Sequence, residues 1–227
     1  KIENSRKKGN INILKVDKDD NKTTIEGVEF DLLDSTGKNI IKHVKTDKNG
    51  KAEIKNLDIG KYILRETKTR KEYKIALEQN ITIEWGKTLN LTIENEKMKG
   101  KVKITKISED DNLITGEVAG TPIANVKFEI YDDSGKLVDT LITKTDGIAI
   151  SKDLVVGKYI VKEKETGEYY EINENDFEVE ITKNGEVVGL TISNKSKTPP
   201  PEKPKEETPK IEVPPIEPIK KLPVTGY

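Results

Sequence analysis

Three polar residue types recur at matching places in the two halves of this chain, on segments whose other residues suit a buried strand. Successive side chains of a strand point to opposite faces of a sheet. By this alternation, Lys15 shares a face with the isoleucines of NINILKVD, Glu66 with the tyrosine and leucine of KYILRET, and Asn95 with the leucines and isoleucine of TLNLTIEN. The second half repeats the same types as Lys106, Glu163 and Asn194.

A lysine, a carboxyl group and an amide on one buried face can react with one another. A lone buried Lys or Glu is costly unless it is paired or neutral. We expect burial to keep the amine neutral and nucleophilic and the Glu protonated, so that the amine attacks the carbonyl carbon of the Asn side chain. The product is an amide with loss of ammonia, and the Glu shuttles protons and polarises the carbonyl. The alternative is a buried hydrogen-bonded cluster that does not react.

The elements that must position these residues form an internal repeat. Each copy spans about 90 to 100 residues, the size of one sandwich domain. Short alternating segments rich in Ile, Val, Leu and Thr are separated by turn signals such as DSTG, DKNG and DDSG, which favours an all-β sandwich of the immunoglobulin-like or prealbumin-like kind. We therefore predict two tandem domains, 10–97 and 98–196. Residues 1–9 match the boundary segment TIENEKMKGK and are expected to end a preceding repeat.

Composition excludes several classes of function. The 40 Lys and Arg residues nearly balance the 41 Asp and Glu residues, so no net charge favours nucleic acid as a partner. There is no cysteine, which removes disulfides, thiolate metal sites and thiol nucleophiles. His43 is the only histidine and is expected at a surface strand position. No phosphate loop, GxSxG or HExxH occurs, so we expect neither an enzyme that turns over a substrate, nor a cofactor, nor a metal.

Residues 197–221 form a proline-rich segment, and every proline before the final LPVTG lies there except Pro122. Such a run favours an extended, polyproline-like spacer. At about 3.1 Å per residue its reach is on the order of 75 Å, the scale of a strut through a cell wall. The alternative is a disordered tail without a spacing role.

The C-terminal segment 222–227 contains LPVTG, which resembles the sorting signal that sortase transpeptidases recognise in Gram-positive surface proteins. The residues concerned are Leu222, Pro223, Val224, Thr225 and Gly226. The resemblance implies cleavage after the threonine and transfer of its carboxyl group to an amine of peptidoglycan or of another subunit. A precursor would continue into roughly 20 apolar residues and a basic tail. Neither is present here, and KIENSRKKG has no apolar core, so we expect an excerpt of a longer, extracellular, wall-anchored protein.

The segments KVD, GVEFDLLDSTG, TDKNGKAEIKNL, GKYILRET and TIEN resemble Cna B-type (prealbumin-like) domains of Gram-positive adhesin stalks and pilins. The likeness covers residues 10–196, and YxLxE is its most specific element. It implies spontaneous isopeptide bonds that join Lys15 to Asn95 with help from Glu66, and Lys106 to Asn194 with help from Glu163. By the same pattern Asn4 is the acceptor of a preceding repeat.

This sequence departs from the family pattern at three places. The stretch KTRKEY after the first Glu lacks the common Ala-Pro-x-Gly-Tyr sequence. Ser108 in the second copy stands where the first has Asp17, and Lys164 stands where the first has Thr67. These differences put the loop geometry in question more than the cross-link.

Two further segments have some features of ligand sites. DKDDNKTTIE has a lysine, Lys22, where a calcium loop needs glycine, so a solvated acidic turn is expected. Trp85 precedes a turn, and we expect it to pack at the end of the sandwich rather than to form a ligand platform.

The sequence favours a structural stalk of a wall-anchored surface protein, with a sortase and a peptidoglycan peptide as partners. A pilin subunit is one alternative, although no Tyr-Pro-Lys occurs. An adhesin module that contacts a host extracellular-matrix protein such as collagen is another. A third is a stalk that carries an enzyme upstream.

Overall fold

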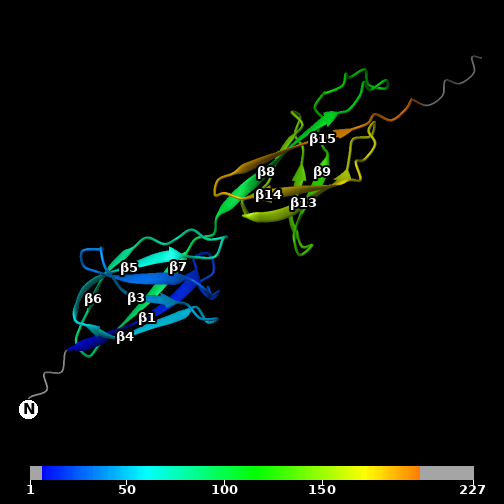
Figure 1. Cartoon of the computed structure of the whole chain (residues 1–227). Coiled ribbons are helices and arrows are strands. Elements are labelled where there is room, and N and C mark those ends of the chain that lie inside the picture. The colour runs from blue at the N-terminus through cyan, green and yellow to red at the C-terminus, as the bar shows by residue number, and fades with distance from the viewer. Residues whose placement is uncertain (1–6, 200–227) are drawn as a thin grey trace, which may run out of the picture.

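The computed structural model of the protein describes residues 7–199 and contains only strands, turns and irregular segments in that range. Two β-sandwiches succeed one another along the chain, domain 1 with β1 to β7 and domain 2 with β8 to β15 (Figure 1). The expected fold class, all-β with two tandem sandwiches, is thereby confirmed. Asn4, the LPVTG segment and all of the proline-rich spacer from residue 200 on lie outside the described residues. Within those residues, no helix is long and apolar enough to cross a membrane.

Domain 1 consists of a three-stranded sheet packed on a four-stranded sheet. The strand orders are β4-β1-β7 and β3-β2-β5-β6. The strands are β1 (Lys8–Asp17), β2 (Glu29–Asp34), β3 (Ile40–Lys45), β4 (Lys51–Asp58), β5 (Gly60–Lys68), β6 (Gln79–Ile83) and β7 (Thr88–Asn95).

Domain 2 repeats this plan. One sheet has the order β10-β9-β13-β14, and in the other β8 pairs with β11, β12 and β15. The strands are β8 (Lys99–Ser108), β9 (Lys127–Asp132), β10 (Leu137–Ile142), β11 (Ile148–Ile150), β12 (Leu154–Val155), β13 (Gly157–Glu165), β14 (Asp176–Ile181) and β15 (Val187–Asn194).

Alternation of apolar and polar residues forms the two cores. In β8, KGKVKITKIS, every second residue is buried, and the inward residues include Val102, Ile104 and Lys106. Each domain has its own cluster of buried apolar residues, one around Phe30 and one around Phe128. Each sandwich therefore buries its apolar faces without the other domain.

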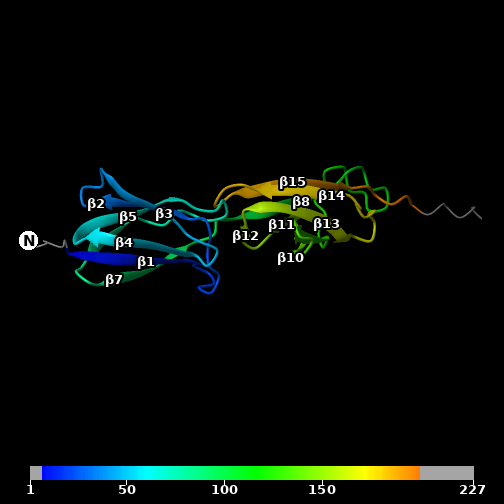
Figure 2. The same ribbon diagram turned by 60° about the horizontal axis from the view of Figure 1, so that its bottom comes forward.

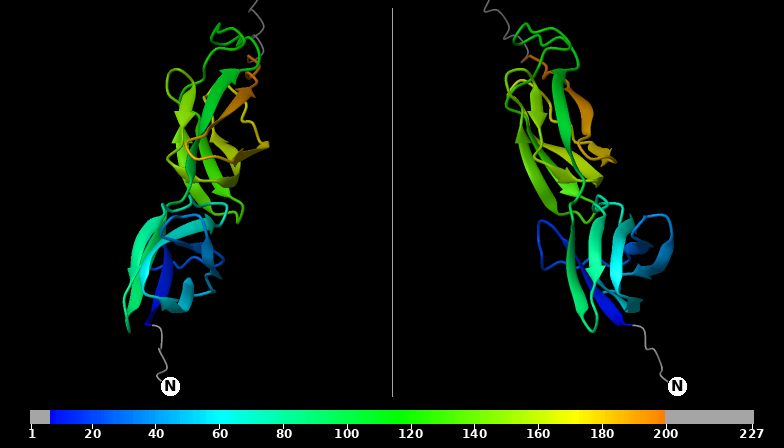
Figure 3. Two further views of the ribbon diagram at one scale, coloured as in Figure 1. Left: turned by 60° about the vertical axis from the view of Figure 1, so that its left-hand side comes forward. Right: turned by 90° about the vertical axis from the view of Figure 1, so that its left-hand side faces the viewer.

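The first and last strands of each domain are parallel neighbours. β1 pairs with β7 along its length from residue 10 to residue 17, and β8 pairs with β15 in the same way. Figure 2 shows the consequence: the chain enters each sandwich at one end and leaves it at the other. Only Glu96, Lys97 and Met98 separate β7 from β8. The two domains therefore meet end to end, as both views of Figure 3 show.

Two surface residues can be compared with their expected places. His43 lies on edge strand β3 with about half of its side chain exposed, as expected. The expectation for Trp85 is wrong, because its side chain does not pack at the end of the sandwich but is 68% exposed. It lies in the turn between β6 and β7, where the Lys7 amine is 5.3 Å from the ring centroid.

Candidate cross-link sites

In domain 1, three strands bring the candidate residues together inside the sandwich. Lys15 comes from β1, Glu66 from β5 and Asn95 from β7, and all three are buried. The Lys15 Nζ atom is 2.5 Å from Asn95 Oδ1 and 2.8 Å from Glu66 Oε2. Asn95 Nδ2 donates a hydrogen bond of 2.6 Å to Glu66 Oε1. One carboxyl group thus contacts both the amine and the amide nitrogen.

Domain 2 contains the same arrangement. Lys106 on β8 donates to Asn194 Oδ1, and its Nζ is 2.9 Å from Glu163 Oε2. Asn194 Nδ2 donates to Glu163 Oε1 at 2.5 Å. The second contact of the lysine is a well-aligned hydrogen bond here, whereas the carboxylate oxygen Oε2 of Glu66 receives no hydrogen bond of good geometry.

A tight turn fixes the backbone at Lys15. Its N–H donates to the carbonyl of Gly50 at 2.8 Å, and its own carbonyl accepts from Ile25 at 3.0 Å. Gly50 has a φ of 69°, and a Cβ atom there would lie 2.6 Å from the Lys15 carbonyl oxygen. Only glycine fits this position without a shift of the backbone. The turn therefore contributes to the placement of the lysine from outside the three strands that carry the site.

Two threonines complete the amide contacts, and the sequence analysis did not identify them. Asn95 Nδ2 donates to Thr69 Oγ1 at 2.8 Å, and Asn194 Nδ2 donates to Thr166 Oγ1 at the same distance. Each threonine lies three residues after its glutamate, so the repeated spacing Glu-x-x-Thr was the signal that could have identified them. These hydroxyl groups hold the amide with its nitrogen toward the carboxyl group.

Aromatic rings close the sites on the lysine side. The amine of Lys15 lies 5.8 Å from the ring centroid of Phe30, and that of Lys106 lies 5.9 Å from that of Phe128. Burial lowers the pKa of both lysines below the usual value, and the neighbouring glutamates oppose this shift in part. A lowered pKa favours the neutral amine, which is the nucleophilic form.

The family model of the SpaA prealbumin-like fold domain matches residues 9–97 and 100–196. The chain belongs to this family. The Bacillus anthracis TIE protein is similar in structure, with a TM-score of 0.71 and 29% identity over 84% of this chain and 34% of the TIE chain. The trypsin-resistant surface T6 protein of Streptococcus pyogenes is 33% identical over 81 residues, 36% of this chain and 15% of that protein. The minor pilin of Streptococcus agalactiae matches with 20% identity and a TM-score of 0.41, over 86% of this chain and 99% of the pilin.

The two prealbumin-like domains differ at the second position after the lysine. Asp17, two residues after Lys15, is fully buried and accepts a hydrogen bond of 2.8 Å from Tyr73. The amine of Lys97 lies 2.6 Å from the same oxygen, Oδ2, and Oδ1 accepts the backbone N–H of Asp19 at 2.8 Å. In domain 2, the Ser108 hydroxyl at this position donates to a backbone carbonyl instead. The departure noted in the sequence therefore changes the end of the domain where the chain leaves it, while the contacts among Lys, Glu and Asn are alike in the two domains.

The acidic segment that resembles a calcium loop has other partners. Asp17 is paired as described, and Asp20 accepts hydrogen bonds from the backbone of Lys22 and the hydroxyl of Thr23. Among residues 7–199, no group of three or more His, Cys, Asp or Glu side chains is placed to hold a metal ion.

Proposed function

We propose that the chain is a stalk segment of a cell-surface protein, in which each prealbumin-like domain closes itself with a Lys–Asn isopeptide bond. The observation that carries the proposal is the duplicated buried site, with one carboxyl group bridging the amine and the amide nitrogen in both domains. A purely packing role gives no reason to place a lysine, a glutamate and an asparagine in each core, since burial of such groups is costly.

The proposed reaction exchanges one bond for another. The neutral amine of Lys15 adds to Cγ of Asn95, the bond from Cγ to Nδ2 breaks, and that nitrogen leaves as ammonia. One proton must pass from the attacking to the leaving nitrogen. Glu66 can carry it, because Oε2 lies at the amine and Oε1 at the amide nitrogen. Glu66 and Glu163 each act once, in a single turnover.

A stalk benefits from this bond in two ways. Closing loops of 80 and 88 residues between the joined side chains stabilises each domain by about 4 to 5 kcal/mol on the loop-entropy expression used for disulfides. The bond also joins the end of the first strand to the end of the last strand. Tension that enters at Lys8 would leave through Asn95 without pulling on the residues between Lys15 and Asn95.

Intact-mass spectrometry of the purified chain tests the cross-links. We expect a mass below the sequence mass by two ammonia molecules in the native chain, by one in Lys15→Ala or Lys106→Ala, and by none in the double variant. Lys55→Ala is the matched control, since it makes the same change at an exposed lysine and should keep both losses. A native mass equal to the sequence mass would show that the two hydrogen-bonded clusters have not reacted, and it would contradict the proposal.

We further infer that the LPVTG segment is joined by a sortase to an amine of peptidoglycan or of another subunit, which would place the protein outside the cell on a Gram-positive wall. The support is the sequence at residues 222–226 and the surface location stated in the name of the T6 protein. Incubation with a purified sortase and a short glycine peptide should replace Gly226 and Tyr227 by that peptide. Pro223→Ala should abolish the exchange, and an unchanged native mass would contradict the inference.

A further inference from the structure

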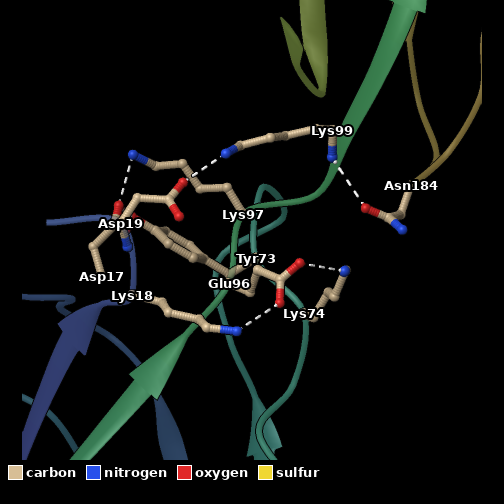
Figure 4. Close-up of polar contacts among 9 residues, drawn as sticks. All are labelled: Asp17, Lys18, Asp19, Tyr73, Lys74, Glu96, Lys97, Lys99 and Asn184. Carbon is tan, nitrogen blue, oxygen red and sulfur yellow. Dashed lines mark hydrogen bonds and ion pairs between the residues drawn. The ribbon is translucent and has the colours of Figure 1, made fainter. Parts of the chain in front are cut away.

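The junction between the two domains is built from backbone hydrogen bonds and charged side chains, and Figure 4 shows the charged side chains. Met98 donates its N–H to the carbonyl of Glu72 in domain 1 at 2.8 Å and accepts from Val156 of domain 2 at 3.0 Å. Lys99 is the first residue of β8, and its amine lies 2.6 Å from Asp19 of domain 1. The starting end of domain 2 is thus bound to the acidic exit end of domain 1.

The starting end of domain 1 has the same backbone construction. Lys7 accepts from Ile59 at 3.4 Å, as Met98 accepts from Val156. Lys8 accepts from Gly86 at 2.9 Å, as Lys99 accepts from the glycine of the equivalent turn at 2.7 Å. In both domains a glycine of the first strand lies close to this turn. A Cβ atom on Gly9 would lie 2.5 Å from a backbone oxygen of the turn in domain 1, and one on Gly100 would lie 2.6 Å from a backbone oxygen of the turn in domain 2.

The sequence before domain 1 extends this equivalence. Residues 2–4 read Ile-Glu-Asn and residues 8–9 read Lys-Gly, and residues 93–95 and 99–100 read the same at the same spacing. Arg6 corresponds to Lys97, the cation that pairs with buried Asp17. Two cations of the connection between the domains, Lys97 and Lys99, therefore have counterparts of matching charge in front of domain 1, Arg6 and Lys8.

Two exposed apolar side chains, Ile59 and Trp85, lie beside two lysines at this end of domain 1. Lys7, Lys8, Ile59 and Trp85 form what we call the N-terminal pole. Ile59 is 46% exposed, while its counterpart Val156 packs partly buried against the core of domain 2. Trp85 takes the place of Asn184, whose side chain accepts from the backbone of Lys99 at the junction. Tryptophan gains much from burial and is enriched in protein interfaces.

We propose that the N-terminal pole of domain 1 is the docking surface for another prealbumin-like domain, joined to it through residues 4–8. That domain would present an acidic exit end like the one domain 1 presents to domain 2. Its counterpart of Asp19 would face Lys8, and its backbone would accept from the N–H of Lys7. The amine of Lys8 now lies 2.7 Å from the partly exposed carboxylate of Asp58. On docking, Lys8 would exchange this exposed ion pair for one with the aspartate of the other domain, and an exposed pair of this kind contributes little to stability.

An extended chain tests the proposal with a local probe. Residues 9–95 of the protein, carrying Trp85→Tyr, are fused directly to residues 5–227, so that the remaining Trp85 is the only tryptophan and lies at the new junction. We expect its emission to shift to shorter wavelength and its acrylamide quenching constant to fall by about twofold relative to the native chain, because the ring leaves water. Hydrogen exchange of the peptide with the Trp85→Tyr change reports whether the added copy is folded.

Two controls make the outcome decisive. Asp19→Asn in the added copy removes the partner of Lys8 and should return part of the quenching. If the added copy does not fold, Asn184→Trp with Val156→Ile in a Trp85→Tyr background puts the side chains of the N-terminal pole at the existing junction, where the same twofold protection is expected.

Quenching of the tryptophan equal to that of native Trp85, in whichever of these chains is folded, would overturn the proposal. Concentration-dependent dimers of the native chain that protect Trp85 would also overturn it, by assigning the pole to a second copy.

Discussion

Each buried lysine shares its site with a glutamate, and this pairing determines how an unreacted domain responds to pH. A Lys–Glu pair binds one proton near neutral pH, whether the proton lies on the amine or on the carboxyl group. The separated side chains of the unfolded chain also bind one proton between them in this range. Folding of the complete site therefore neither takes up nor releases a proton, although the pKa of Lys15 is lowered by burial.

Removal of the glutamate should make the free energy of unfolding depend on pH. In Glu66→Gln only the weaker attraction of Glu94 opposes the effect of burial on the pKa of Lys15, so the folded amine binds fewer protons than the unfolded one. Stability should then rise with pH from the lowered pKa of the amine up to about 10.4, by at most about 1.4 kcal/mol per pH unit. Urea unfolding monitored by Trp85 fluorescence measures this dependence. Asn95→Ala also blocks the bond but keeps the pair, and an equally steep slope in that control would contradict the explanation.

At the scale of elements, the position of the lysine depends on the turn before β4. Asp47 holds this turn by accepting the backbone N–H groups of Asn49 and Lys51 at 2.9 and 2.8 Å. Gly50 then lies against the backbone of β1, beside Lys15. The pairing of β1 with β7 aligns the two strands, and the turn holds the backbone of β1 at Lys15 through the hydrogen bond to Gly50.

Gly50 and Gly86 have nearly the same φ, but only Gly50 has close neighbours. Alanine substitutions at the two positions therefore distinguish the cost of backbone strain from the cost of a steric clash. Gly86→Ala, at a φ of 67° with open space around the position, should cost about 1 kcal/mol from the left-handed conformation alone. Gly50→Ala, at 69°, adds a clash with the carbonyl of Lys15 and should cost at least about 2 kcal/mol more. It should also leave a fraction of the chain without the first ammonia loss. Equal unfolding free energies and full ammonia loss in both variants would refute this role of the turn.

At the scale of the whole molecule, the connection between the domains is itself part of domain 1. Glu96 accepts from the amines of Lys18 and Lys74 at 3.1 and 2.8 Å, which lowers the pKa of its carboxyl group to about 2. Lys97 completes the buried site of Asp17 and Tyr73. Burial tends to raise the pKa of Asp17, but the bonds to Lys97 and Tyr73 outweigh it and the pKa is lowered. The linker is therefore fixed by the fold that precedes it.

Lys97→Met should destabilise domain 1 because it leaves a buried carboxylate without its cation. The expected loss is about 2 kcal/mol, since the lysine is partly exposed. The lowered pKa of Asp17 stabilises the fold above about pH 4 and no longer does so once acid protonates the group, so the difference from the native chain should shrink below that pH. Urea unfolding at several pH values measures it. Lys101→Met, which removes an exposed pair, should change stability by less than about 0.5 kcal/mol, and a similar loss there would refute the argument.

Strand alternation and the internal repeat were sufficient to predict the sandwiches and to choose Lys15, Glu66 and Asn95 as residues that face one core. Thr69 was not found, because it lies just beyond β5, where alternation no longer defines a face. The pair of Asp17 and Lys97 was not found either, since Lys97 lies in the linker beyond β7, where alternation defines no face, and it meets Asp17 only when the linker folds back on domain 1. Local patterns identify the faces of strands, whereas contacts between loops depend on the assembled fold.

The parallel placement of β1 beside β7 also has a topological consequence. Lys15 and Asn95 are 80 residues apart in the chain but adjacent in space. Once joined, they make a closed ring of all the residues between them, as Lys106 and Asn194 do in domain 2. A protease that cuts one peptide bond in a surface loop of such a ring opens the ring without dividing the molecule. Damage to a loop would then not detach what the stalk carries.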